Sequence, residues 1–111
     1  MSENTTKWRK DELEAYLLFY CANADFVETE EEKIFIHRRV SDEVYSKIHL
    51  EFIKDKDYTR IQKIIEAAER LELSKEEVNI LFKEIESLFN AAGKYTILEK
   101  EIFIGLRRVL I

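Results

Sequence analysis

The sequence predicts an all-α protein, a single compact bundle of six to seven helices that contains two similar helix-turn-helix units. The chain of 111 residues has no Pro and only two Gly, whereas a β protein with many tight turns needs such residues at close intervals. Its hydrophobic content of 46% is enough for one domain of this length to bury a core. Apolar residues recur three or four positions apart along most of the chain, which is the helical period.

The first helix is expected to follow Thr5 or Thr6, because either side chain can cap a helix N-terminus. Its second half is apolar nearly all round, which is typical of a helix at the centre of a bundle. The single Cys21 lies in this helix and has no activating basic residue close in sequence, so a buried thiol is favoured over a nucleophile. Residues 1–5 are expected to be disordered.

The second helix is predicted to start at a T-x-x-E capping box formed by Thr29 and Glu32. It ends at the basic residues 37–39, whose charges suit the C-terminal end of the helix dipole. Ser41 is expected to cap the third helix, and the charged run 54–57 to end it. The predicted buried stripe of the third helix consists of Val44, Ile48 and Phe52.

The fourth helix is indicated by the apolar residues Ile61, Ile64, Ile65, Ala68 and Leu71. A second capping box, Ser74 with Glu77, starts the fifth helix. Gly93 is expected to end it, because Gly readily adopts the left-handed conformation beyond a helix C-terminus. The fifth helix has the clearest amphipathic pattern, and its predicted core residues are Val78, Leu81, Phe82, Ile85, Leu88 and Phe89.

The last helix is predicted to start at a third capping box, Thr96 with Glu99. Gly105 lies inside this helix at a cost in helix stability, so another helix backbone is expected to pass close to it. Residues 109–111 are too apolar to be left in solvent and are expected to fold onto the core or to meet a second subunit.

An internal repeat links two distant parts of the chain. Residues 23–33 recur as residues 90–100 with five of eleven positions identical, and both copies lead to an Ile-Phe-Ile triplet, at residues 34–36 and 102–104. Each copy joins one apolar helix to the next. The repeat therefore predicts two related helical hairpins whose turns lie at related edges of one bundle.

Both copies resemble the A-D-G-x-[VIY]-[ST]-x-x-E signature that occurs twice in TerB-like domains of the tellurite-resistance family; the matching residues are 24–32 and 91–99. The same all-helical module occurs in the cytoplasmic part of a membrane-anchored DnaJ-like co-chaperone. The similarity extends from about Leu13 to Leu110, because the spacing of the signatures and the intervening helices also match. It implies a non-catalytic interaction or sensing module in a cytoplasmic stress response, with a protein partner of unknown identity. It does not imply tellurite resistance itself.

The resemblance also implies an acidic site, because the Asp and Glu of both signatures form a cluster in the family that is proposed to bind a metal ion or a partner. The corresponding residues here are Asp25, Glu32 and Glu99, whereas Phe26 and Ala92 depart from the signature's Gly and second Asp. Three carboxylates would hold Ca²⁺ or Mg²⁺ only weakly, since these ions take six or more oxygen ligands. As alternatives, Glu32 and Glu99 cap their own helices and Asp25 forms a turn.

Two aromatic residues beside these carboxylates, Phe26 and Tyr95, are candidates for a partner-binding surface, because aromatic side chains contribute strongly to interface energies. The alternative is that both rings cover the end of the bundle. No catalytic constellation is found, since no nucleophile or phosphate-loop motif is present and His37 and His49 have no neighbouring ligands at metal-site spacing. A metal-assisted hydrolase that uses the same carboxylates and a purely structural homodimer subunit are the alternative functions.

Net charge and hydropathy limit the binding partners and the location that are expected for the protein. The net charge of −5 weighs against nucleic-acid binding. The richest apolar stretch, residues 15–24, is shorter than the ~20 residues that span a bilayer, so a cytoplasmic location without direct membrane insertion is expected. No linker or change of composition divides the chain, so residues 1–111 are expected to form one domain, with no cofactor other than a weakly bound divalent cation.

Overall fold

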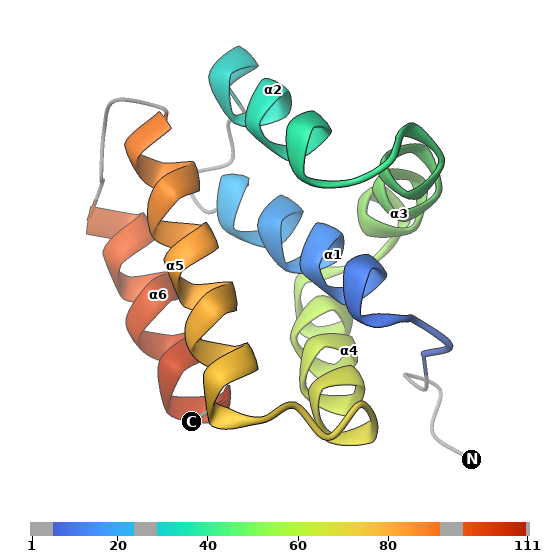
Figure 1. Ribbon diagram of the computed structural model, residues 1–111, viewed down its shortest axis with the longest axis vertical. Helices are drawn as coiled ribbons and strands as arrows, with labels where there is room; N and C mark the ends of the chain where they lie inside the picture. The colour runs from blue at the N-terminus through green and yellow to red at the C-terminus, as the bar shows by residue number, and fades with distance from the viewer. Residues whose placement is uncertain (1–5, 24–28, 92–96, 111) are drawn as a thin grey trace.

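The computed structural model describes residues 6–23, 29–91 and 97–110, which form six α-helices and no strand (Figure 1). The all-α class predicted from the sequence is therefore confirmed for this part of the chain. The radius of gyration is 12.9 Å, close to the ~13 Å of a compact domain of this size. In chain order the helices are α1 (Lys10–Ala22), α2 (Glu30–Arg39), α3 (Asp42–Lys54), α4 (Asp57–Arg70), α5 (Lys75–Ala91) and α6 (Ile97–Leu110).

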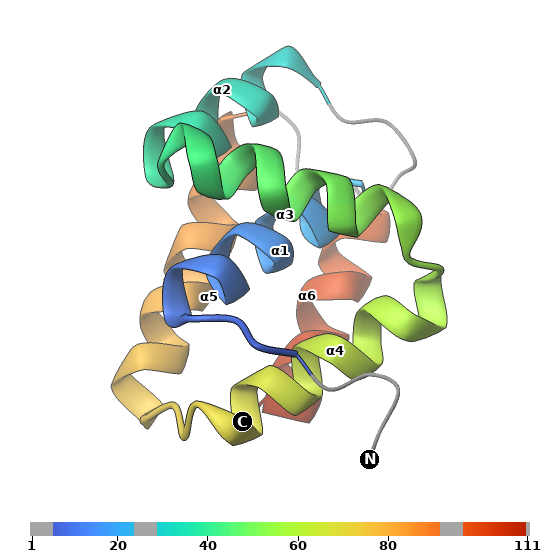
Figure 2. The same ribbon diagram turned by 90° about the vertical axis from the view of Figure 1, so that its right-hand side faces the viewer.

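Helix α1 lies at the centre of the bundle and contacts each of the other five helices (Figures 1 and 2). Every residue of α1 from position 15 to position 22 is buried, so the helix predicted from its apolar second half to be central is central. Full burial of a large apolar side chain contributes ~1.5–3 kcal/mol. This one helix thus contributes more buried side chains to the core than any other helix, and the thiol of Cys21 is buried among them.

The surrounding helices turn single apolar stripes toward α1, as their amphipathic patterns predict. The stripe of α3 consists of Val44, Ile48 and Phe52, and that of α5 of Val78, Phe82, Ile85, Leu88 and Phe89; all of these are buried. Leu81 was expected in the core but is only partly buried, because it lines an open groove between α1 and α5.

Two of the predicted helix starts away from the repeat are observed as hydrogen bonds. The amide of Glu77 donates to Ser74 Oγ at 3.1 Å, and the amide of Ser74 donates to Glu77 Oε1 at 3.2 Å. The hydroxyl of Ser41 accepts from the amide of Val44 at 3.2 Å. These bonds satisfy backbone N–H groups that the first turn of a helix leaves without partners. The third predicted box, Thr96 with Glu99, lies outside the described side chains.

The start of α1 differs from the prediction. Helix α1 begins after Arg9, and Thr6 instead donates from both its amide and its hydroxyl to Glu66 Oε1 on α4, at 2.6 and 2.7 Å. The guanidinium of Arg70 donates to the same hydroxyl at 2.9 Å, so the side chain of Thr6 is committed to tertiary contacts. The amide of Arg9 donates instead to Glu12 Oε1 at 2.9 Å.

A polar network fastens the buried face of α1 to α3 and α4. Tyr16 is fully buried, and its hydroxyl donates to Asp55 Oδ2 at 2.7 Å. The ammonium of Lys63 donates to the same carboxylate oxygen at 2.7 Å and to Glu51 Oε2 at 3.0 Å. Burial and the carboxylate of Asp55 both raise the pKa of Tyr16, so the hydroxyl keeps its proton and remains a donor.

Gly105 does not mark a close helix crossing. A Cβ atom built on this residue would meet no atom within 4 Å, and the position is exposed on α6. The prediction that another backbone passes close by is therefore wrong. The residue weakens α6 without any packing gain within the described part of the chain.

Replacing Gly105 with Ala should raise the free energy of unfolding by ~0.5–1 kcal/mol, because Ala loses less backbone entropy in a helix and has room for its methyl group here. Urea denaturation measures the change. The matched variant Ser87→Gly, at an exposed position of α5, should shift stability the other way. A loss of stability in Gly105→Ala would show that the added methyl group meets an obstacle.

Replacing Phe82 or Ile85 with Ala should lower the free energy of unfolding by ~2–5 kcal/mol, since each change leaves a cavity in the core. Ile80→Ala provides the control on the same helix, because Ile80 is 56% exposed and should cost less than ~1 kcal/mol. Urea denaturation of the three variants measures these differences. Equal losses at all three positions would contradict the assignment of the buried face of α5.

Candidate functional site

The described flanks of the two repeat copies converge on one end of the bundle. The copies begin at the C-terminal ends of α1 and α5 and continue into α2 and α6. Helix α1 contacts α5, and both contact α2 and α6; the C-terminal ends of α1 and α5 lie toward the same end of the bundle as the start of α2 (Figures 1 and 2). We call this region, residues 22–23, 29–32 and 90–91, the repeat end.

Glu32 is the one predicted metal ligand whose side chain the structure describes, and it caps α2. It is 2% exposed. Its Oε1 accepts from the amide of Thr29 at 2.9 Å and from the hydroxyl of Thr29 at 3.0 Å, while its own amide donates to Thr29 Oγ1 at 3.1 Å. This is the reciprocal capping box that the sequence predicts.

The other predicted site residues are not placed. Asp25 and Phe26 lie outside the described residues, as do Tyr95 and the side chain of Glu99. Within the described ranges no group of three or more His, Cys, Asp or Glu side chains is arranged to hold a metal ion. Any ligand role of Glu32 would have to leave the capping bonds at Oε1 in place, or the start of α2 would be weakened.

The two histidines belong to an aromatic cluster. The ring of His37 stacks on Tyr45 with a centroid distance of 3.6 Å and an interplanar angle of 14°. The ring of His49 lies beside Tyr45 and the buried Phe19, at centroid distances of 5.7 and 5.0 Å, and these two rings also contact each other at 5.1 Å. Both imidazoles therefore have a packing role between α2, α3 and α1.

A shallow hollow of about 240 Å³ opens beside the repeat end, between α2 and the last residue of α5. Ile34 is 48% exposed there, and Phe35 is half-buried with the guanidinium of Arg39 4.8 Å from its ring centroid. We call it the α2–α5 hollow; its lining residues are Glu31, Ile34, Phe35, Arg38 and Ala91.

The α2–α5 hollow was not predicted, although the sequence contains a signal for it. Three consecutive apolar residues cannot all face the core from one helix, because successive side chains point about 100° apart. In the triplet 34–36 only Ile36 is fully buried. The triplet therefore had to leave apolar surface exposed on α2.

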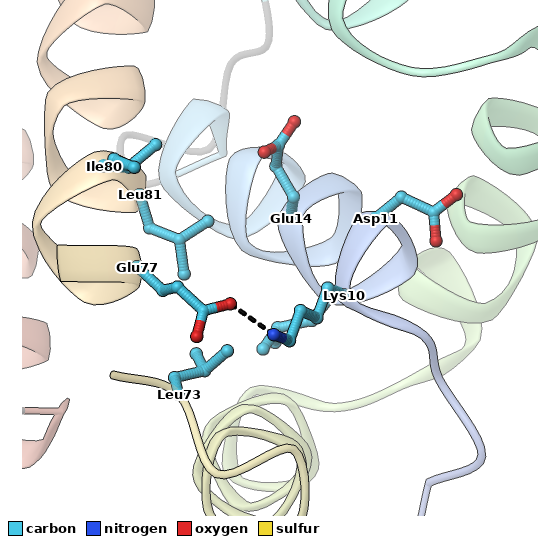
Figure 3. Close-up of a pocket in the computed structure, with 8 residues that line it drawn as sticks. Lys10, Asp11, Glu14, Leu73, Glu77, Ile80 and Leu81 are labelled. Atoms are coloured by element: carbon cyan, nitrogen blue, oxygen red, sulfur yellow. Dashed lines mark hydrogen bonds and ion pairs between the residues drawn. The ribbon is translucent and has the colours of Figure 1, made fainter. Parts of the chain in front are cut away.

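A second depression, the α1–α5 groove, lies between the first turns of α1 and the first half of α5 (Figure 3). It has a volume of about 310 Å³, an apolar floor and a charged rim. The ammonium of Lys10 and the carboxylate of Glu77 form an ion pair across it, drawn as the dashed line in Figure 3. The groove is lined by Lys10, Asp11, Leu13, Glu14, Leu73, Glu77, Ile80 and Leu81.

Acidic groups dominate the electrostatics of the α1–α5 groove. Burial and then the charge of Glu84 raise the pKa of Glu14, and the charge of Arg39 lowers it in part. Arg39 Nε lies 2.8 Å from Glu84 Oε2, so this guanidinium is already engaged. The ion pair with Lys10 is the main cause that lowers the pKa of Glu77. Three carboxylates and one ammonium thus surround an apolar floor, and the carboxylate of Asp11 is paired with the guanidinium of Arg9 outside it.

Comparison with protein-family models, with curated proteins and with solved structures found no match for this chain. In the part of the chain that the structure describes, none of the helices has the length and apolar character needed to cross a membrane.

The capping role of Glu32 predicts that millimolar Ca²⁺ or Mg²⁺ leaves the melting temperature within ~1 °C of its value without the ion. An ion bound to the folded state would instead stabilise it by RT ln(1 + [L]/Kd). Thermal melts of the wild type, Asp25→Asn, Glu32→Gln and the exposed neighbour Glu31→Gln measure this. A rise of several degrees that the first two variants abolish and Glu31→Gln retains would establish the metal site.

Proposed function

We propose that this protein is a non-catalytic interaction module of the TerB-like kind, and that the repeat end is its working surface. The observation that carries the proposal is that the helices preceding the two repeat copies, α1 and α5, contact one another and also contact the helix that follows the first copy. We infer from these contacts that the two related segments contribute to one composite surface. The resemblance adds a setting, the cytoplasmic side of a stress-response system.

The described part of that surface has the features of a small interface. The exposed Ile34 and the half-buried Phe35 supply apolar area in the α2–α5 hollow, with Glu31 and Arg38 at its edge. Interfaces typically combine such an apolar centre with a polar rim. The proposal adds Phe26 and Tyr95 as aromatic anchors.

The acidic residues have different roles in this proposal. Glu32 fixes the first turn of α2 through its capping bonds, and this holds Glu31 and Ile34 in position at the hollow. Asp25 and Glu99 contribute charge to a partner surface rather than a strong metal site, since three carboxylates fall short of the oxygen ligands that Ca²⁺ or Mg²⁺ takes.

Replacing Ile34 with Ser should remove most of the partner protein that co-purifies with the tagged wild type from its native host, because an apolar anchor at an interface centre typically contributes ~1–2 kcal/mol or more. Phe26→Ser and Tyr95→Ser should have the same effect while leaving the melting curve largely unchanged. Quantitative mass spectrometry of the purified complexes measures the recovery.

The matched control is Ile53→Ser. Ile53 is 56% exposed on α3 and does not line the hollow, so this variant should retain the partner. Equal recovery with wild type and Ile34→Ser, or loss of the partner only with Ile53→Ser, would contradict the assignment of the repeat end.

A further inference from the structure

The α1–α5 groove is not used by the proposed working surface. It is built from the N-terminal halves of α1 and α5, whereas the repeat end lies at the C-terminal ends of the same two helices. The groove exposes apolar side chains, since Ile80 is 56% exposed and Leu73 and Leu81 are only partly buried. Contiguous exposed apolar surface with a polar rim is typical of a binding site.

The charges around the groove are unbalanced. Asp11, Glu14 and Glu77 carry three negative charges at its rim, against the positive charges of Lys10 and of the neighbouring Arg9, whose Nε lies 3.2 Å from Asp11 Oδ1. Lys10 is committed to Glu77 by their ion pair. Glu14 faces the further negative charge of Glu84, whose partner Arg39 lies 2.8 Å away on α2. Since Arg9 is paired with Asp11 and Lys10 with Glu77, the excess of negative charge is at Glu14, where a cation would offset it.

We propose that the α1–α5 groove binds an amphipathic helix of a partner protein that carries Lys or Arg beside its apolar face. Helices commonly recognise partners by placing an apolar stripe in a groove, with anchors at positions i, i+3, i+4 and i+7. The apolar floor fits such a stripe, and the acidic rim is complementary to flanking basic residues. The assignment rests on the proposed function, because both treat the protein as a binding module.

Charge complementarity also decides between this occupant and others. A second copy bound about a two-fold axis would bring the same patch against itself, so the acidic rims would face each other. An anionic membrane surface attracts basic rather than acidic segments.

The binding site can be located with a synthetic helical peptide that has Leu at i, i+3, i+4 and i+7 and Lys at the flanking positions. Added to ¹⁵N-labelled protein, this peptide should shift the amide signals of residues 10–14 and 73–81. A control peptide with Glu in place of each Lys should cause no shift there. Shifts confined to residues 31–38, equal shifts with both peptides, or no shift at millimolar peptide would overturn the proposal.

Two variants then test the floor and the rim separately. Ile80→Ser should weaken binding of the Lys peptide by about tenfold or more, as expected for loss of an apolar anchor. Glu14→Gln should weaken it by roughly threefold, as expected for loss of one rim charge. Fluorescence anisotropy gives the dissociation constants, and the amide spectra show that each variant is folded.

Matched controls come from positions that do not line the groove. Ile104→Ser on α6, where Ile104 is 52% exposed, and Glu86→Gln on the exposed side of α5 should leave the dissociation constant within about twofold. If the Ile80→Ser variant binds the Lys peptide as tightly as the Ile104→Ser variant does, the assignment of the groove floor is overturned.

Recovery of the host complex and binding of the peptide test the two proposals separately. Loss of the host partner in Ile34→Ser, together with an absence of peptide binding, keeps the proposed function and overturns the groove assignment. Peptide binding that maps to residues 10–14 and 73–81, together with an unchanged host complex in Ile34→Ser, supports the groove and overturns the repeat end as the working surface.

Discussion

The fold depends on the burial of one helix, α1, within the other five. A helix that is apolar nearly all round can only be stable if it is covered on every side, and residues 15–22 are indeed all buried. Each surrounding helix then needs only one apolar stripe, which explains why α3, α4 and α5 are amphipathic while α1 is not. Because α1 runs through the middle, its two ends emerge at different places on the surface. The α1–α5 groove forms at one end and the repeat end at the other.

Burial of α1 also requires its polar atoms to find partners inside the protein, since an unsatisfied buried hydroxyl is costly. The hydroxyl of Tyr16 meets this requirement through Asp55, which in turn is held by Lys63. Burial tends to lower the pKa of Lys63, but its bonds to Asp55 and Glu51 outweigh that effect and raise it, so the ammonium stays charged. The network joins α1 to α3 and α4 with a geometry that apolar contacts alone do not define, because hydrogen bonds are directional and apolar contacts are not.

The features of the fold that could be predicted from the sequence are those set by local interactions. The starts of α2, α3 and α5 follow from capping bonds that span three residues, and these are observed. The start of α1 was predicted wrongly because Thr6 is held by Glu66, sixty positions away, and no local pattern reports such a contact. The prediction for Gly105 was wrong for the same reason, because the space beside a helix position depends on which other helices pack against it. Of the candidate site, the capping bonds of Glu32 were predicted from the sequence and are observed, whereas neither the hollow nor the groove was predicted.

The same residue type serves different purposes at the two ends of α1 because burial and neighbours differ. Glu32 is almost completely buried and its Oε1 is bonded to the turn that it caps, so its main effect is on the geometry of α2. Glu14 is half-buried at an open groove, close to a second carboxylate, so its charge acts on whatever occupies that groove. The net charge of −5 counts both carboxylates alike and does not show which of them is buried. The tertiary packing around α1 therefore decides which carboxylates support the fold and which face a partner.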